Sequence, residues 1–305
     1  MKKRVDGSKL KSILLTVAVT LFAAFVVIPL FFSLFFDGEK LGNVALIPIE
    51  GAITGSGETE LGALTVSSED IVTFIEEADK NPQVKVLLLE INSPGGSAVA
   101  SDEIASAVKK SSKPVVALIR EAGASGGYWV ASAADYVIAN RMSITGSIGV
   151  LSSYLEFSGL MEKYGVGYEQ LTAGEYKDMG APFKKLSEPE RKIMQSKLDK
   201  IHQYFIEEIA VNRGLEVSRV EALATGEFFL GVEALELGLV DALGDKNTAE
   251  EFIKESYGLK KVDYILYQHR SGFLEALSTV FSDLHFSIGE GIGSMLIKQH
   301  IGVWM

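Results

Sequence analysis

The chain has 305 residues, of which 47% are hydrophobic and 23% charged, a composition typical of a globular protein with a buried core. It contains no cysteine, which excludes disulfides, thiolate metal sites and thiol nucleophiles, so covalent catalysis would need a hydroxyl or an amine. The net charge of −11 argues against a nucleic-acid partner, because phosphates attract basic surfaces.

The N-terminal region predicts a membrane anchor. Residues 12–36 carry no charged side chain, and a helix of this length can span about 30 Å of hydrocarbon. A cleaved signal peptide is the alternative, but its apolar region is usually about 7–15 residues long. Because residues 1–11 are basic while Asp37 and Glu39 follow the span, we expect a single-pass protein of the cell membrane. Its N-terminus would be cytoplasmic and the remainder extracytoplasmic.

After residue 41, strand and helix patterns alternate. Apolar runs predict strands at 44–49, 84–91, 114–119 and 136–139. Periodic apolar positions predict helices starting near 67 or 68 and at 97–110, 126–134 and 188–212. Run 84–91 is almost continuously apolar, as expected of a strand covered on both faces in a parallel sheet. The pattern predicts one α/β domain of βαβ units at 41–258, and a tail, 259–305, that could pack on it, join subunits or contact the membrane.

Two glycine-rich segments follow consecutive predicted strands. One is Asn-Ser-Pro-Gly-Gly at 92–96 and the other is Gly-Ala-Ser-Gly-Gly at 123–127. At such strand-to-helix junctions the helix presents free N–H groups, and glycine lets a substrate approach the backbone closely. Neither segment has the spacing of a phosphate-binding loop. Because the second segment contains a serine, Ser125, the pair favours acyl chemistry.

A serine nucleophile needs a base, and the sequence favours a lysine. The four histidines all follow Ser125 by more than 75 residues: His202, His269, His285 and His300. Among the lysines, Lys177 lies in a loop after a strand-like segment, 168–174, where burial would favour the uncharged amine. A Ser/His/Asp peptidase remains a disfavoured alternative. The sequence has no H-E-x-x-H motif and no cluster of His, Asp and Glu, so neither a metal nor another cofactor is expected.

These motifs resemble those of the signal peptide peptidase A (SppA) family, membrane-anchored Ser/Lys peptidases with the ClpP/crotonase α/β spiral fold. The resemblance covers roughly residues 41–258. It rests on Ile91-Asn-Ser-Pro-Gly-Gly96, the block from Ala124 to Asp135, Thr145-Gly-Ser-Ile-Gly-Val150, Gly174-Glu-Tyr-Lys-Asp178 with Pro182-Phe183, and Gly238-Leu-Val-Asp241.

The resemblance implies a role for particular residues. Ser125 would be the nucleophile, Lys177 its base, and Ser147 would hydrogen-bond the lysine. The N–H groups of Gly126 and Gly96 would form the oxyanion hole. Where the family often has serine, this chain has Ala181.

The resemblance also implies how the protein works. It would have one catalytic domain per chain in a homo-oligomer on the membrane, and it would cut remnant signal peptides and other short hydrophobic or unfolded polypeptides. Small apolar side chains would be favoured next to the cut. Two alternatives stay open: a crotonase-type enzyme acting on acyl-CoA, and a non-catalytic membrane scaffold of the same fold.

Overall fold

The computed structural model describes residues 7–28, 42–57 and 64–268 of the chain. The chain divides into two compact units, Met1–Leu41 and Gly42–Met305. In the first unit, helix α1 (Gly7–Phe22) continues into a π-helical turn, η1 (Ala23–Val27). No helix within the described ranges combines the length and the apolar character that a membrane span requires. Residues 29–36 of the expected anchor lie outside these ranges.

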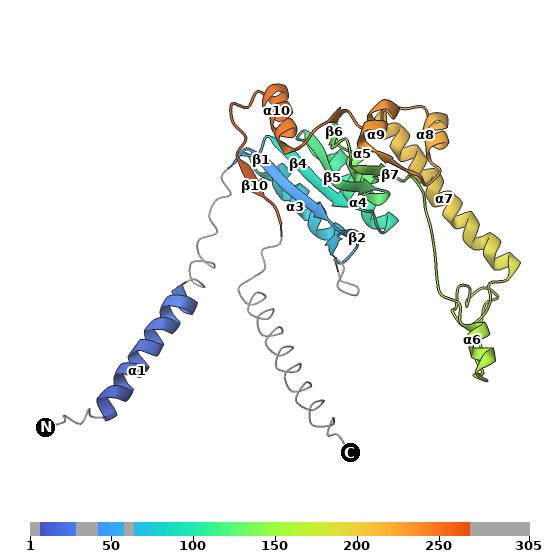
Figure 1. Cartoon of the computed structure of the whole chain (residues 1–305), viewed down its shortest axis with the longest axis horizontal. Helices are drawn as coiled ribbons and strands as arrows, with labels where there is room; N and C mark the ends of the chain where they lie inside the picture. The colour runs from blue at the N-terminus through green and yellow to red at the C-terminus, as the bar shows by residue number, and fades with distance from the viewer. Residues whose placement is uncertain (1–6, 29–41, 58–63, 269–305) are drawn as a thin grey trace, which may run out of the picture. The chain divides into compact units, whose positions relative to one another are not determined.

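The second unit is built on a largely parallel sheet (Figure 1). Its strands are hydrogen-bonded in the order β10-β1-β4-β5-β6-β9, and all neighbours in this order are parallel. Their bounds are β1 (Val44–Glu50), β4 (Val86–Ser93), β5 (Val115–Ala124), β6 (Tyr136–Ala139), β9 (Ala242–Leu243) and β10 (Tyr264–Leu266). The end of β5 also pairs with β7 (Ile144–Gly146), whose other neighbour is the antiparallel β8 (Phe228–Leu230). Strands β2 (Ala52–Thr54) and β3 (Thr65–Ser67) form a separate parallel pair.

Helices cover both faces of this sheet. Strand β4 shows why: Leu87 and Leu89 belong to one buried cluster, whereas Val86 and Leu88 belong to another. The first cluster includes residues of α3 (Ser68–Lys80), α4 (Ala98–Lys110), α5 (Gly126–Ser132), α7 (Glu188–Arg213), α8 (Val217–Leu223) and α9 (Gly231–Leu237). The second includes residues of α10 (Lys246–Tyr257), and Figure 1 shows α3 and α10 on opposite sides of the sheet. The predicted α/β class, with a parallel sheet buried on both faces, is confirmed.

Two sequence-based boundaries and one predicted strand differ in the structure. Strand β5 runs to Ala124 and therefore includes the first two residues of the second glycine-rich segment. The sheet continues past residue 258, because β10 pairs with β1. The strand expected at 168–174 was wrong: the segment is exposed and belongs to no strand. Strand assignment there depended on apolar residues that have no sheet neighbour.

Residues 151–187, called the arm below, extend from the sheet along the N-terminal half of α7 (Figure 1). The arm contains helix α6 (Ser158–Lys163) and otherwise consists of loops. Internal contacts shape it: the Phe157 N–H donates to the Pro182 carbonyl (2.7 Å), and the Tyr168 and Phe183 ring centroids lie 4.8 Å apart. Not one of its residues is buried. The arm therefore has no hydrophobic core of its own in the single chain.

Candidate functional site

Ser125 occupies a strained turn between β5 and α5. Its φ of 51° and ψ of −122° are rare for a residue with a side chain, and such strain concentrates at functional sites. Two hydrogen bonds hold the turn: the Ser125 N–H donates to the Gly146 carbonyl (2.8 Å), and its carbonyl accepts from Trp129 N–H (2.9 Å). The serine is thus fixed between the C-terminal end of the central strand β5 and the N-terminal end of helix α5.

The two glycine-rich segments pack directly against each other. A Cβ atom on Gly95 would lie 2.7 Å from the Gly126 nitrogen and 2.9 Å from the Ser125 Cβ, and one on Gly126 would lie 3.3 Å from the Gly96 nitrogen. A Cβ on Gly96 would approach the Ile53 carbonyl oxygen to 2.0 Å. Only glycine fits at Gly95 and Gly96 without a shift of the backbone, and a Cβ on Gly126 would collide with the Ser101 Oγ (2.2 Å). Both glycine segments are therefore required for close packing of the backbone around Ser125.

The N–H groups of Gly96 and Gly126 lie close together and carry no acceptor among the residues that the structure describes. Gly126 is the first residue of α5, where an N–H has no partner within the helix. Two unpaired donors beside a serine can stabilise negative charge on a tetrahedral intermediate. This arrangement agrees with the oxyanion-hole assignment, which stays a prediction.

Ser147 also lines the cavity that contains Ser125 and has a second strained conformation, with φ at 50°. Its hydroxyl donates to the Gly226 carbonyl (3.2 Å) and its N–H donates to the Glu227 carbonyl (3.0 Å). In this chain the hydroxyl is therefore oriented by the backbone before β8. Its expected hydrogen bond to the lysine remains a prediction.

A cavity of about 590 Å³ opens beside Ser125. Its walls include Trp129 of α5, Phe205 of α7 and Leu151 at the start of the arm, and the two aromatic rings stack at 4.7 Å. The indole Nε1 of Trp129 is buried without a hydrogen-bond partner in the described part of the chain. The cavity therefore has two aromatic side chains in its wall, which suits an apolar side chain of a substrate.

His202 also lines this cavity, although the sequence gave no reason to single it out. Its Nε2 lies 3.3 Å from the Ile148 carbonyl oxygen, a contact that restrains the ring. Its position follows from α7: three residues before the buried Phe205, it shares the helix face that points to the core. The other histidines, His269, His285 and His300, lie outside the described residues.

Lys177 is not part of this cavity in the single chain. The structure places it in the arm, where its side chain is exposed, so the expected burial was wrong for the isolated chain. The physical reason is the missing strand at 168–174: without it, nothing covers the loop. The structure thus brings Ser125, Gly126, Gly96 and Ser147 together and leaves Lys177 apart from them.

An ion-pair cluster attaches the loop that carries Lys177 to helix α7. The Lys184 Nζ lies 2.7 Å from Asp178 and 2.7 Å from Glu190, at the first turn of α7. Hydrogen bonds from Lys184 and Ser187 lower the pKa of Glu190 to about 2. The same cluster raises the pKa of Lys184, because Asp178 and Glu190 both stabilise its charge. The residue next to Lys177 is therefore anchored to α7.

No metal-binding cluster of three or more His, Asp or Glu side chains occurs within the described ranges. The Gly238-Leu-Val-Asp241 motif lies away from the cavity and has a structural role. Asp241 accepts from the Val137 N–H (2.7 Å) and pairs with Arg213, while the Leu239 carbonyl accepts from the buried Tyr128 hydroxyl (2.7 Å). These contacts hold the segment before β9 against α5 and β6.

Comparison with known proteins points to peptide-bond hydrolysis. The model of peptidase family S49 matches residues 107–260, which include Ser125, Ser147 and Lys177. A protein of Methanocaldococcus jannaschii named as a protease is 30% identical over 86% of this chain and 84% of its own length. A protein of Enterococcus faecium named as signal peptide peptidase SppA is 31% identical, covering 84% of this chain and 79% of its own. A Synechocystis protein named as a protease is 36% identical over 71% of this chain and 75% of its own length.

Proposed function

The chain belongs to peptidase family S49 and is a serine peptidase, and from this premise we propose that it cuts peptide bonds with a Ser125/Lys177 dyad. The observation that carries the proposal is the position of Ser125, in a strained turn beside two unpaired glycine N–H groups. We assign it remnant signal peptides and other short hydrophobic or unfolded polypeptides as substrates. The aromatic wall of Trp129 and Phe205 supports an apolar substrate.

The proposed reaction proceeds through an acyl-enzyme. The uncharged Lys177 amine accepts the Ser125 proton while Oγ attacks the peptide carbonyl, and the N–H groups of Gly126 and Gly96 stabilise the oxyanion. As the carbon–nitrogen bond breaks, Lys177 returns the proton to the leaving amine. A water molecule, deprotonated by the same lysine, then hydrolyses the ester and regenerates the Ser125 hydroxyl.

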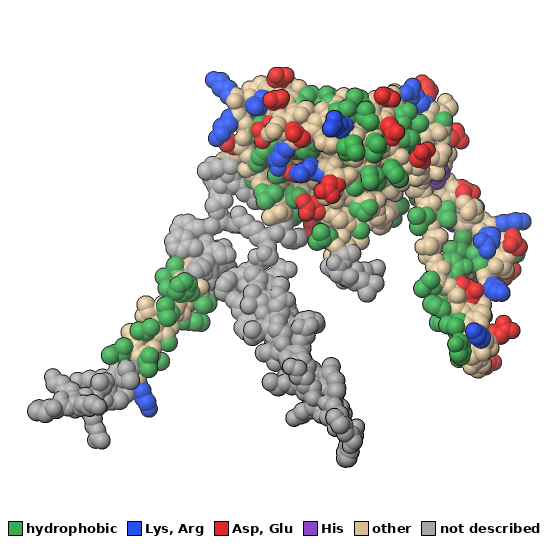
Figure 2. All heavy atoms as spheres, in the orientation of Figure 1, with side chains coloured by type: hydrophobic (Ala, Val, Ile, Leu, Met, Phe, Trp, Pro, Cys, Tyr) green, Lys and Arg blue, Asp and Glu red, His purple; other side chains and the backbone are tan. Residues whose placement is uncertain are grey.

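We propose further that the lysine reaches the serine of a second copy, in a homo-oligomer. Two observations support this: Lys177 is exposed outside its own chain's cavity, and the arm that carries it exposes large apolar side chains. Figure 2 shows this hydrophobic surface along the arm. Its most exposed members are Leu151 (84%), Leu155 (72%) and Leu171 (95%). Contiguous apolar exposure of this kind marks protein contact surfaces.

The proposed setting is the cell membrane, with the N-terminus cytoplasmic and the peptidase domain outside. The uncharged stretch at 12–36 and the basic residues before it support this topology. We also assign the domain to the ClpP/crotonase-like spiral fold, which the parallel sheet and the two glycine-rich junctions support. Acyl-CoA binding tests the crotonase alternative, and labelling of Ser125 by a fluorophosphonate tests the inert scaffold.

Mixing two inactive variants tests the dyad and its location together. Ser125→Ala and Lys177→Ala should each abolish cleavage of a hydrophobic peptide by the full-length protein. Coexpressed in equal amounts, they should regain about a quarter of wild-type activity, because random assembly pairs an intact serine with a neighbour's intact lysine in that fraction of sites.

Each alternative gives a different result. Turnover by either purified variant would overturn the dyad. Two inactive variants that stay inactive when mixed would place the lysine in the same chain as its serine. His202→Gln is the control for a histidine base: loss of cleavage in this variant, with Lys177→Ala still active, would move the base to His202.

A further inference from the structure

Strand β5 changes partners immediately before the Ser125 turn. Residues 116–119 pair with β6, whereas residues 122–124 pair with β7. On its other side, Ile91 of β4 pairs with Ile119 and Ser93 pairs with Gly123, so β5 contains two more residues than β4 over this interval. Residues 120–122 therefore form a bulge, and the bulge sets the direction in which β5 delivers Ser125.

Little packing supports this bulge on one side. Arg120 and Glu121 are exposed and line a second cavity of about 650 Å³, together with residues around the start of α10. A segment that borders open space on one side cannot be held there by side-chain packing. Its conformation must depend more strongly on polar contacts.

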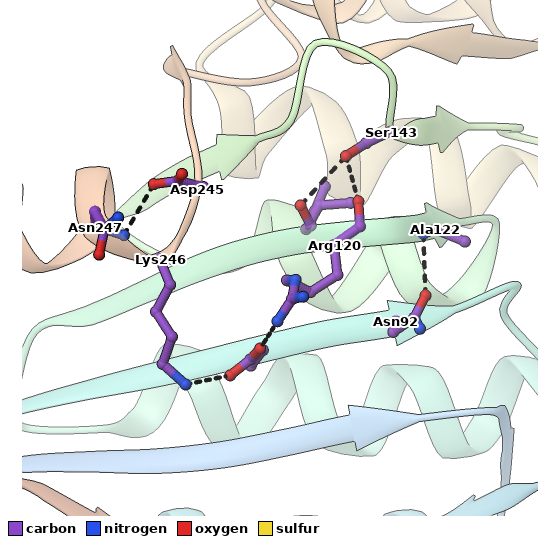
Figure 3. Close-up of polar contacts among 9 residues, drawn as sticks. Asn92, Arg120, Ala122, Ser143, Asp245, Lys246 and Asn247 are labelled. Carbon is purple, nitrogen blue, oxygen red and sulfur yellow. Dashed lines mark hydrogen bonds and ion pairs between the residues drawn. The ribbon is translucent and has the colours of Figure 1, made fainter.

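Three side chains provide those contacts, and Figure 3 shows two of them labelled. The Asn92 Oδ1 accepts from the Ala122 N–H (3.2 Å), and the Ser143 hydroxyl donates to the carbonyls of Ile119 (3.3 Å) and Arg120. Glu90 pairs with Arg120 and with Lys246 of α10 (2.8 Å for the latter), which restrains the arginine. Burial alone would raise the pKa of the Glu90 carboxylate, but hydrogen bonds and charge interactions with Lys246 and Arg120 outweigh it and lower this pKa.

Asn92 differs from Glu90 and Ser143 because it lies in the glycine-rich segment that carries Gly96. It begins the segment 92–96, which brings Gly96 to the cavity, while its side chain holds the end of β5, which brings Ser125. This hydrogen bond links the segment that carries Gly96 to the strand that leads to Ser125, in addition to the pairing of Ser93 with Gly123. We propose that Asn92 is a positioning residue that sets the spacing between Ser125 and the Gly96 N–H; this rests on the proposed role of Ser125.

The distance between nucleophile and oxyanion donors affects the rate steeply, since a displacement of about 1 Å can cost about 10²-fold. Asn92→Leu keeps the size of the side chain and removes the acceptor, so we expect kcat to fall about 10- to 100-fold with KM nearly unchanged. Asn92→Asp keeps an oxygen acceptor and should retain kcat within about threefold of wild type. Peptide cleavage and the rate of Ser125 labelling by a fluorophosphonate measure both variants.

Asn81→Leu is the matched control. The Asn81 Oδ1 accepts from the Gln83 N–H (3.0 Å), a similar side-chain-to-backbone hydrogen bond at the end of α3, away from the cavity. This variant should lose stability without losing kcat. If Asn81→Leu lowers kcat as much as Asn92→Leu does at equal stability, the effect is general and the positioning role is wrong.

Hydrogen exchange of the full-length protein separates this inference from the proposed function. Asn92→Leu should speed exchange at residues 120–126 relative to Asn92→Asp, whether or not any peptide is cut. Unchanged exchange in Asn92→Leu would overturn the positioning role, and so would an unchanged labelling rate. If the wild-type protein cuts no peptide while Asn92→Leu still exchanges faster than Asn92→Asp, only the proposed function is overturned.

Discussion

The junction of β5 and α5 and the arm at 151–187 supply different parts of the proposed site, and they are held by different forces. The junction is enclosed: Gly126, Gly127 and Trp129 are buried, and backbone hydrogen bonds fix Ser125 on both sides. The arm has no buried residue, and it is held by an ion pair and hydrogen bonds with Glu190 of α7 and by a few internal contacts. The proposed nucleophile and oxyanion donors thus lie together within one chain, while the proposed general base is presented on a surface.

This difference suggests how the activity of such a peptidase is controlled. A preformed serine without a base is a poor nucleophile, so a single chain would be nearly inactive. In the proposed oligomer, contact of the arm with a neighbour would both cover its apolar side chains and deliver Lys177. Assembly would then be a condition for cleavage, and perturbing either region should have a separable effect.

The largest effect should come from the enclosed junction. In Gly126→Ala the new Cβ would lie 2.2 Å from the Ser101 Oγ. Because Ser101 is buried and its hydroxyl donates to the Ser97 carbonyl (2.9 Å), we expect the turn to shift and displace the Gly126 N–H. We expect kcat to fall about 10²- to 10³-fold, the usual cost of losing one oxyanion donor. Adding Ser101→Ala removes the colliding oxygen and should restore part of kcat. Full activity of the single variant would exclude this N–H as an oxyanion donor.

A smaller effect should come from the arm. Leu171→Asp places a carboxylate on its most exposed apolar residue, and burying that charge unpaired against a neighbour would cost several kcal/mol. We expect a smaller assembly by light scattering and activity reduced about tenfold or more, with the melting temperature of the domain unchanged. Val211→Asp, on the exposed side of α7 (74% exposed), is the control. Equal losses in both variants would argue that the arm has no special role in assembly.

The same contrast explains what the sequence could predict. Continuous apolar runs such as 84–91 have one good solution, a strand between two helix layers, and β4 forms there. The long helix was predicted at 188–212 and spans Glu188–Arg213, because Pro189 at its start and Gly214 after its end are strong local signals. Ser125 was found because glycines on both sides mark a close backbone approach.

The arm and the bulge could not be predicted in this way. Tyr168 and Leu171 have apolar side chains, but whether they form a strand depends on a neighbour that the sequence does not reveal. The bulge at 120–122 depends on which strand pairs with each half of β5, a tertiary property. Asn92 lies in a glycine-rich segment and His202 is one of four histidines, but their individual positions could not be predicted because they arise from contacts with distant segments.

The smallest effect concerns the attachment of the arm to α7 and appears as a pH dependence. Because the folded pKa of Glu190, about 2, lies below its ordinary value of 4.5, its contribution to stability is fully present above pH 4.5 and is lost as the pH falls towards 2. Protection from hydrogen exchange at residues 178–190, measured relative to the intrinsic exchange rate at each pH, should therefore fall over that interval in the wild type. Glu190→Gln should exchange faster already at neutral pH and show little further change on acidification.

Glu188→Gln is the control. The Glu188 carboxylate is exposed and makes only a long ion pair with Arg191 (3.9 Å), so this variant should behave like the wild type. If Glu190→Gln and the wild type respond to acid in the same way, the ion-pair cluster does not hold the loop that carries Lys177, and its position must depend on the internal contacts of the arm and on a neighbouring subunit.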